Sequence, residues 1–259
     1  MTDLQAILDA GGPWEQARII GDQLLIQGDC REVMEVLPKV CAVVTDPPYG
    51  VTDHKWDVVV PAGVWMIAPA AIVTATEPFA TALINAAPLR FLYDMVWVKN
   101  CASNSMNAKR MPMRRHERVL IFGQPYYTAP KRKRTTEELA RLNMEQRERY
   151  PDAAFDSVLD IPCVNNRSGD RTSHPSQKPE DLMGALVGAF SSRTQTILDP
   201  FMGSGTTLVA CQRLGRQGIG IELDPEYYAI ACKRVQEVVN NPPLFTPAPP
   251  KPTQDAMDL

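Results

Sequence analysis

Short apolar runs rich in β-branched residues alternate along this chain with longer segments of helical periodicity. Such alternation predicts an α/β, doubly wound fold, in which helices cover both faces of a mainly parallel sheet. The predicted strands, about seven in number, lie at residues 23–27, 41–45, 71–75, 91–98, 119–122, 196–199 and 218–222. The predicted helices lie at residues 31–37, 78–87, 179–190, 206–214 and 225–240, and Gly215 is expected to end the fourth of them.

The pattern changes in residues 124–173, which are polar and basic and contain one predicted helix at 136–149. We interpret this segment as an insertion that protrudes from the sheet. It divides the chain into a first half of the sheet domain (1–123), the insertion, a second half (174–240) and a tail (241–259). Six prolines in the tail cannot continue a helix and predict a flexible or polyproline-like end.

Charge is distributed unevenly along the chain. The net charge of the 259 residues is −3, yet residues 99–149 contain 13 Lys and Arg residues against five acidic ones. A charged segment is usually a solvated surface. The clustering of these cations, however, is suited to neutralising the phosphates of a nucleic acid. The candidate nucleic-acid-binding residues are Lys109, Arg110, Arg114, Arg115, Lys131, Arg132, Lys133 and Arg134.

The composition excludes several classes of protein. With 44% hydrophobic and 22% charged residues the chain is an ordinary globular one, not collagen-like, wholly disordered or coiled-coil. No apolar run approaches the roughly 20 residues of a membrane span, and the first residues lack a secretory signal pattern, so we expect a cytoplasmic protein with no membrane partner. The six cysteines have no C-x-x-C spacing and there are only three histidines. We therefore predict no metal site and expect reduced, mostly buried thiols.

The first stretch that carries chemical information is Asp46-Pro47-Pro48-Tyr49, which directly follows a predicted strand. Ligands of open α/β sheets bind beyond the carboxyl ends of strands. The two prolines have a fixed φ and no N–H, so this loop is rigid and offers only carbonyl acceptors. A carboxylate before them and an aromatic ring after them suit a planar heterocycle that bears an amino group. The plainer interpretation is a turn that ends a strand and contains an incidental Asp.

A second stretch, residues 197–207, runs from an apolar strand through Gly203 and Gly205 into a helix. The glycines permit a tight turn and the close approach of a ligand, and the start of the helix supplies free N–H donors for an anionic group. No G-K-[ST] follows, which disfavours a phosphate loop, and the third glycine of the nicotinamide fingerprint is missing. Glu222 ends the next predicted strand, where an acidic residue is suited to accept both hydroxyls of a ribose.

Together the two stretches resemble the S-adenosylmethionine-dependent DNA amino-methyltransferases, specifically their beta class. The resemblance extends from Leu24 to Val239 and includes DPPYG at 46–50 and DPFMGSGTT at 199–207. It also includes Gly28-Asp29, Arg115-His116-Glu117, HPSQKP at 174–179 and the segment 221–228. The DPPY loop precedes the glycine loop, with the basic insertion between them. The resemblance therefore implies a Rossmann-like, seven-stranded methyltransferase sheet that is circularly permuted and has a target-recognition segment at 124–173.

The resemblance also implies roles for single residues. Asp46, Pro47, Pro48 and Tyr49 would hold a base that has been rotated out of the duplex. Glu222 would bind the cofactor's ribose, Asp29 would approach its adenine, and Lys178 would meet its carboxylate. The full set of implied cofactor-binding residues is Asp29, Lys178, Asp199, Phe201, Gly203, Ser204, Gly205, Thr206, Glu222 and Asp224. We interpret five others as structural, surface or loop residues: His54, Trp56, Trp65, Trp97 and His116.

The activity that the resemblance implies is transfer of a methyl group from S-adenosylmethionine to the N6 amine of adenine in double-stranded DNA. Members of the family that act on the N4 amine of cytosine more often have Ser at the position of Asp46, so cytosine is the alternative substrate. The family also suggests a homodimer and a restriction endonuclease as further partners.

Other classes of protein fit the motifs less well. A DNA-binding module that has lost catalysis is opposed by the complete DPPY and glycine loops, and an RNA-directed enzyme is an alternative that an assay with duplex DNA and RNA would test. Glutamine methyltransferases of the protein-release-factor type have a similar N-P-P-Y loop, but their motifs occur in the opposite order. A nicotinamide oxidoreductase is disfavoured by the glycine pattern.

Overall fold

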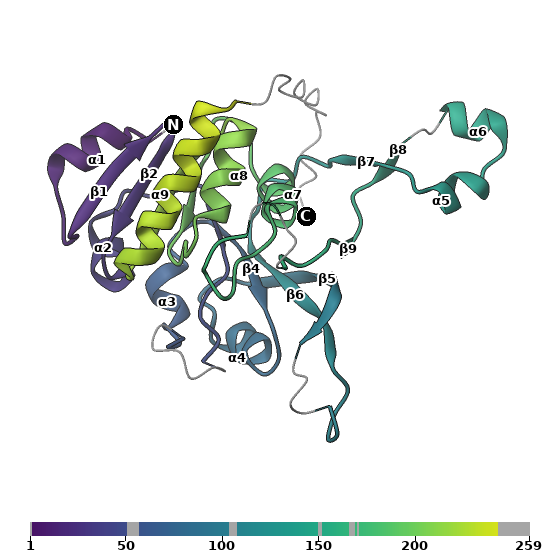
Figure 1. The fold of residues 1–259 in the computed structure, drawn as a ribbon, viewed down its shortest axis with the longest axis horizontal. Coiled ribbons are helices and arrows are strands. Elements are labelled where there is room, and N and C mark those ends of the chain that lie inside the picture. The colour runs from purple at the N-terminus through teal and green to yellow at the C-terminus, as the bar shows by residue number, and fades with distance from the viewer. Residues whose placement is uncertain are drawn as a thin grey trace.

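The computed structural model describes residues 2–50, 57–103, 108–149, 152–165, 169 and 171–242, and Figure 1 shows its fold. A sheet of nine strands has the order β1-β2-β11-β10-β3-β4-β6-β5-β9. Neighbours from β2 to β4 are parallel, whereas β1, β6 and β5 join by antiparallel pairing. The strands of this sheet are β1 (Gln16–Ile20), β2 (Gln23–Gln27), β3 (Ala42–Thr45), β4 (Ala70–Ala75), β5 (Phe91–Ser103), β6 (Arg114–Gly123), β9 (Val158–Asp160), β10 (Thr196–Asp199) and β11 (Gln217–Glu222).

Helices pack on both faces of this sheet because successive strand residues point to opposite sides. Val43 of β3 belongs to the core under the first four helices, whereas Ala42 and Val44 belong to the core under α7 and α8. The last helix, α9, packs against α8 and β2. None of the helices in the described ranges has the length and apolar character needed to span a membrane. The helices of the two faces are α1 (Leu4–Ala10), α2 (Cys30–Val36), α3 (Ala62–Trp65), α4 (Phe79–Ala86), α7 (Glu180–Phe190), α8 (Thr206–Leu214) and α9 (Pro225–Asn240).

The α/β, doubly wound fold predicted from the apolar pattern is confirmed. All seven predicted strands and all five predicted helices are present, and Gly215 ends α8 with a left-handed φ of 63°. Two further strands join the sheet. β1 is a half-exposed edge strand that forms a hairpin with β2 through Gly21 (φ 59°), and β9 has only three residues and pairs with β5. Neither has the continuous apolar run that reveals a buried strand.

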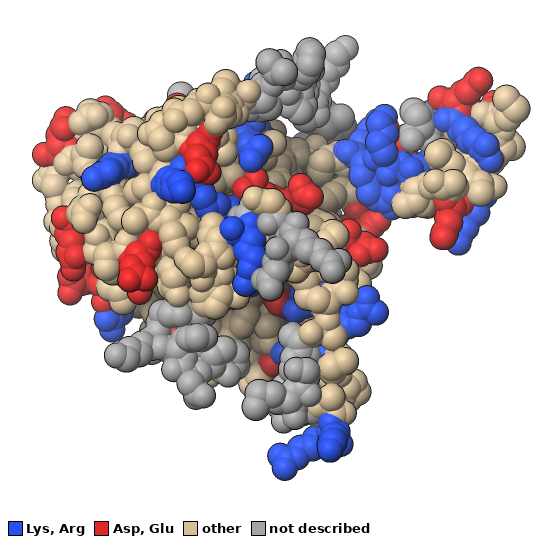
Figure 2. All heavy atoms as spheres, in the orientation of Figure 1, with Lys and Arg blue, Asp and Glu red and all other residues tan. Residues whose placement is uncertain are grey.

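The polar segment between β6 and α7 forms an arm that extends from the sheet (Figure 1). Its elements are β7 (Lys131–Lys133), α5 (Thr136–Ala140), α6 (Met144–Arg149) and β8 (Asp152–Ala154). The prediction of one helix at 136–149 is wrong, because Asn143 starts a second helix: its side chain accepts the N–H of Gln146 (2.8 Å), and the Gln146 side chain accepts the N–H of Asn143 (3.1 Å). Figure 2 shows both basic and acidic side chains on this arm.

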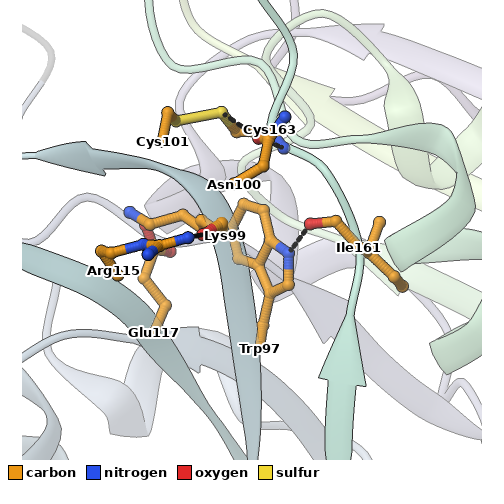
Figure 3. Close-up of a disulfide and its surroundings, with 8 residues drawn as sticks. All are labelled: Trp97, Lys99, Asn100, Cys101, Arg115, Glu117, Ile161 and Cys163. Carbon is orange, nitrogen blue, oxygen red and sulfur yellow. Dashed lines mark hydrogen bonds and ion pairs between the residues drawn. A yellow bond between two sulfur atoms is a disulfide. The ribbon is translucent and has the colours of Figure 1, made fainter.

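The expectation that all six cysteines are reduced thiols is wrong for two of them. Cys101 and Cys163 form a disulfide beside Trp97, whose indole N–H donates to the carbonyl of Ile161 (2.7 Å; Figure 3). Val98 of β5 is in register with Asp160 of β9, and each cysteine lies three residues further along its own strand direction. Parallel pairing thus brings together two residues that are 62 positions apart in the sequence. Of the other cysteines, Cys30, Cys211 and Cys232 are buried free thiols and Cys41 is half-buried.

Candidate active site

A cavity of about 450 Å³ lies at the carboxyl ends of β3, β10 and β11. These strands are adjacent, so the loop after each one opens into the same space: Asp46 follows β3, Phe201 follows β10, and Glu222 ends β11. A cavity of this size is in the range that holds a small-molecule ligand or cofactor. The predicted site residues in its lining are Asp29, Asp46, Pro47, Pro48, Tyr49, Lys178, Asp199, Phe201, Gly203, Ser204, Thr206 and Glu222.

The carboxylate of Asp46 is held on both of its oxygens. Oδ1 accepts hydrogen bonds from the hydroxyls of Tyr49 (2.6 Å) and Thr74 (2.5 Å), and Oδ2 lies 2.5 Å from Nζ of Lys178. The Tyr49 ring packs against Phe79 with the ring centroids 5.1 Å apart. Burial and the charge of Asp46 raise the pKa of the Tyr49 hydroxyl well above its ordinary value, so this hydroxyl stays protonated and donates. The loop after β3 is therefore rigid in its side chains as well as in its prolines.

Glu222 connects the end of β11 to the glycine loop. Its Oε2 accepts the N–H of Gly203 (2.9 Å), and its Oε1 accepts the N–H of Asp224 (2.8 Å). Burial raises the pKa of this carboxyl to about 7. Each carboxylate oxygen has two acceptor positions, so Glu222 retains acceptor capacity toward the cavity.

Asp199 lines the cavity, and its carboxylate is also hydrogen-bonded within the protein. Its side chain accepts hydrogen bonds from the hydroxyls of Thr45 (2.6 Å) and Thr207 (2.5 Å) and from the N–H of Phe201 (3.1 Å). It is 3% exposed, and this burial raises its pKa to about 6. The carboxylate thus ties the end of β3 to β10 and to the first turn of α8.

The two glycines of the loop are required by packing. Gly203 (φ 50°) faces His174, and an added Cβ would come within 2.9 Å of the imidazole Nε2. Gly205 (φ 79°) faces α9, where an added Cβ would lie 2.8 Å from Cβ of Ala231. Both glycines have the left-handed φ that disfavours other residues. All the predicted base- and cofactor-binding residues are described, and two of them, Gly205 and Asp224, do not line the cavity. Asp224 instead caps α9 by accepting the N–H of Glu226 (2.8 Å).

Asp29 and Phe201 line the cavity and are also held by neighbouring side chains. Asp29 caps α2 by accepting the N–H of Arg31 (2.9 Å) and forms an ion pair with its guanidinium. The ring of Phe201 meets Trp65 edge to face, with centroids 5.7 Å apart. Trp65 and Trp97 are buried packing residues and His116 is exposed, as we expected, whereas His54 and Trp56 lie outside the described residues.

Arg234 of α9 is a structural residue of the site that sequence reasoning missed. It is 7% exposed, and its Nη1 donates to the carbonyl (2.8 Å) and hydroxyl (3.1 Å) of Ser204 and to the hydroxyl of Thr206 (3.0 Å). Its Nη2 pairs with Glu180 of α7 at 2.9 Å. In the sequence Arg234 is one of several polar residues of an amphipathic helix, and nothing in that pattern distinguishes it.

His174 and Tyr227 also line the cavity beside the glycine loop, with ring centroids 4.3 Å apart. Burial lowers the pKa of His174 to about 4, so its imidazole is neutral near pH 7. His174 belongs to the HPSQKP motif, which was a signal for its place in the site. Within the part of the chain that the structure describes, no group of His, Cys, Asp or Glu side chains could hold a metal ion.

The predicted nucleic-acid-binding cations fall into two groups. Lys109 and Arg110 are exposed near the tip of the β5–β6 hairpin, where Figure 2 shows basic side chains, and neither forms an ion pair with another described residue. On the arm, Arg132 pairs with Glu138 and Asp156 (2.7 Å each), and Lys133 pairs with Asp152 (3.0 Å). Part of the positive charge of the arm is therefore balanced within it.

The remaining candidate cations divide between the hairpin and the arm. Arg114 and Arg115 begin β6: Arg114 contacts the Thr76 hydroxyl and the carbonyl of Glu77, and Arg115 contacts the carbonyl of Lys99 (3.4 Å). Lys131 is exposed at the start of β7, and Arg134 is half-buried just beyond its end.

The sequence profile of the DNA methylase family, the N6/N4 methyltransferases, matches residues 74–233. The chain belongs to the N6/N4 DNA methylase family. Among its relatives, type II methyltransferase M.HpaI of Haemophilus parainfluenzae is 29% identical over 58% of this chain and 47% of its own length. Type II methyltransferase M2.DpnII of Streptococcus pneumoniae is 51% identical over 24% of each chain. The matches thus span about half or less of these relatives. The crystal structure of the M1.HpyAVI–SAM complex is 25% identical and has a TM-score of 0.56, covering 82% of this chain and 98% of that one.

We expect the stability of this DNA methylase family member to depend on the ionisation of Glu222. Its pKa is about 7 in the folded chain against an ordinary 4.5, so between these values the folded chain holds a proton that the unfolded chain has released. The resulting stabilisation is complete below the ordinary pKa of 4.5 and is lost as the pH rises through the folded-state pKa of about 7. Relative to Glu222→Gln, the wild-type free energy of unfolding should fall by about 3 kcal/mol across this range in urea titrations. A difference that stays constant with pH would contradict the raised pKa.

We expect Arg234→Met to destabilise the chain by roughly 3–5 kcal/mol, because it leaves the buried polar groups of the glycine loop without their donor and Oε1 of Glu180 without its cation. The matched control is Arg213→Met. Arg213 pairs with the same Glu180 (3.0 Å) but its side chain is 50% exposed, so its loss should cost about 0–1 kcal/mol. Urea denaturation of both variants measures the difference, and equal costs would show that Arg234 does not brace the loop.

Proposed function

We propose that the chain transfers a methyl group from S-adenosylmethionine to the exocyclic N6 amine of adenine in double-stranded DNA. One observation carries the proposal: the Asp46–Tyr49 loop and the glycine loop with Glu222 open into a single cavity. The first loop offers acceptors and an aromatic ring to a planar base, and the second offers a nucleoside site. Membership of the N6/N4 DNA methylase family supports both assignments.

The residues of the glycine side fit the cofactor. Glu222 is buried, oriented by two backbone N–H groups and retains acceptor positions suited to ribose hydroxyls. Phe201 and the backbone at Gly203 would line the methionine part, and Asp29 would lie at the adenine end. The M1.HpyAVI structure is a complex with S-adenosylmethionine. When bound, this cofactor supplies a methyl group that its sulfonium has already activated.

Asp46 and Tyr49 would act on the target base. An exocyclic aromatic amine is a poor nucleophile because its lone pair is delocalised into the ring. Acceptors for its N–H groups, Asp46 and the Pro47 carbonyl, favour a localised lone pair on the nitrogen. Asp46 then takes the proton, which is acidic once the nitrogen has gained positive charge. Tyr49 supplies an aromatic surface for the extruded base, whose unstacking costs a few kcal/mol.

We propose adenine and not cytosine as the substrate because position 46 is Asp, whereas members of the family that act on cytosine more often have Ser there. M.HpaI and M2.DpnII are named type II methyltransferases. We extend that description to this chain as a modifying enzyme of duplex DNA that works beside a restriction endonuclease.

The DNA-binding surface we propose centres on the exposed cations of the β5–β6 hairpin, together with Lys131 on the arm. Phosphate contacts release counterions, so unpaired cations contribute most to binding. Arg132 already has two carboxylate partners, and its main role is to hold β7 and α5 together. Residues 124–173 would contact the recognised sequence.

The direct test incubates the full chain with S-adenosylmethionine labelled in its methyl group and unmethylated genomic DNA, then digests the DNA to nucleosides for mass analysis. We expect labelled N6-methyldeoxyadenosine in the wild type and none in Asp46→Ala, with cofactor binding by calorimetry nearly unchanged. Asp181→Ala, at an exposed carboxylate on α7, should retain activity. Detection of labelled N4-methyldeoxycytidine instead would identify cytosine, not adenine, as the substrate. Equal loss of cofactor binding and methyl transfer in Asp46→Ala would refute the role of Asp46.

A separate prediction concerns the contribution of the β5–β6 hairpin to DNA affinity. Replacing Lys109 and Arg110 with Ala should reduce the slope of log affinity against log salt by about two, because each neutralised phosphate contributes roughly 0.9 to that slope. Arg132→Ala is the matched control and should leave the slope unchanged, because Glu138 and Asp156 already balance its charge. Fluorescence anisotropy with duplex DNA at several salt concentrations measures both slopes. If Arg132→Ala reduces the slope and the hairpin variant does not, the DNA interface lies on the arm and not on the hairpin.

A further inference from the structure

A buried row of alternating charges lies behind the loop that follows β3. Nζ of Lys99 is 2.9 Å from Oε1 of Glu117, Oε2 of Glu117 is 3.6 Å from Nζ of Lys178, and Lys178 in turn is 2.5 Å from Oδ2 of Asp46. The side chains of Lys99, Glu117 and Lys178 are 8%, 12% and 9% exposed. Figure 3 shows Lys99 and Glu117 side by side on the neighbouring strands β5 and β6.

Lys178 is charged and anchored. Burial opposes its charge, but the carboxylates of Asp46 and Glu117 outweigh that cost and raise the pKa of its ammonium group above the ordinary value. Its neighbour Gln177 accepts two hydrogen bonds from Thr172 (2.9 and 2.8 Å). On the other side of Lys178, Pro179 is the N-cap residue of α7. The backbone of Lys178 is thus held on both sides, and its ammonium lies against the Asp46 carboxylate.

We propose that Lys178 is a positioning residue, which orients the carboxylate of Asp46 for the target amine and is itself held in place by Glu117 and Lys99. This inference rests on the proposed function. The sequence resemblance implies that Lys178 contacts the carboxylate of the cofactor. The inference assigns Lys178 to the carboxylate of Asp46 instead.

The acceptor positions of Asp46 show how the orientation works. Oδ1 receives the hydroxyls of Tyr49 and Thr74, which fill its two acceptor positions, whereas Oδ2 receives Lys178 alone among the described residues. Oδ2 therefore keeps one position for an N–H of the target amine. Because Lys178 occupies the other, the carboxylate cannot rotate without losing a charge-assisted hydrogen bond.

Glu117 makes this arrangement possible. It separates Lys178 from Lys99 and balances their charges, and those two ammonium groups lower its own pKa despite its burial. Its Oε2 has no hydrogen bond within the described structure, so the charge of Lys178 is its compensation on that side. The four side chains sum to zero charge, which permits burial beside a cavity.

The test compares Lys178→Met, Lys178→Arg and Glu117→Gln with Lys233→Met, which removes an ammonium whose side chain is 79% exposed. Methyl transfer to genomic DNA gives kcat and KM, calorimetry gives the Kd of S-adenosylmethionine, and circular dichroism reports folding. We expect Lys178→Met to lower kcat by roughly 10²-fold through misplacement of the carboxylate, with the Kd of the cofactor unchanged. Lys178→Arg should recover part of kcat, Glu117→Gln should lower it in the same direction, and Lys233→Met should match the wild type.

Three outcomes would overturn the inference. If Lys178→Met raises the Kd of S-adenosylmethionine and preserves kcat, Lys178 binds the cofactor and does not position Asp46. An Arg variant no better than Met would show that the charge beside Asp46 is not what matters. If Lys178→Met does not fold, the inference is tested by Lys178→Arg and Glu117→Gln. A kcat equal to that of the wild type in both of these variants would contradict it. Failure of the wild type itself to methylate DNA would instead refute the proposed function.

Discussion

The parallel pairing of β3 with β10 is the constraint on which the rest of the site depends. In register, Ala42 lies opposite Ile197 and Val43 opposite Leu198, so the two strands end together and their loops face the same cavity. The hydrogen bond from Thr45 to Asp199 closes this pair at its carboxyl end. Thr45 directly precedes Asp46, so an acidic side chain of the glycine-loop motif also sets the position of the loop that would hold the base. Without this pairing the two motifs would be separate loops.

The glycine loop depends on three supports that come from distant parts of the chain. Glu222 accepts one of its N–H groups, Arg234 donates to its carbonyl and hydroxyl groups, and His174 packs against Gly203. Such a loop is pre-organised, because the surrounding helices determine its conformation before any ligand arrives. The cost of ordering a flexible segment is thereby removed from binding.

Charged side chains show a contrast between the body and the arm. Beside the cavity, the carboxylates of Glu117 and Asp46 alternate with the ammonium groups of Lys99 and Lys178. This balance allows Asp46 to face a cavity while Lys178 stays charged. On the arm, acidic residues of α5 and of the segment after β8 pair with the basic strand β7. A count of cations along the sequence overstates the charge that this surface offers to phosphates, because it does not show that carboxylates 6 to 24 positions away pair with Arg132 and Lys133 in the folded arm.

The sequence by itself determined the fold class, seven strands of the sheet and the two loops of the site. These features are local: apolar runs specify buried strands, prolines and glycines specify turns, and the spacing of motifs specifies their order along the chain. Only the tertiary structure decided which groups meet. The Cys101–Cys163 disulfide, the Arg234 brace and the contact of Lys178 with Asp46 join residues 62, 30 and 132 positions apart. Such contacts depend on how strands pair and how helices pack over them, and no local pattern records that arrangement.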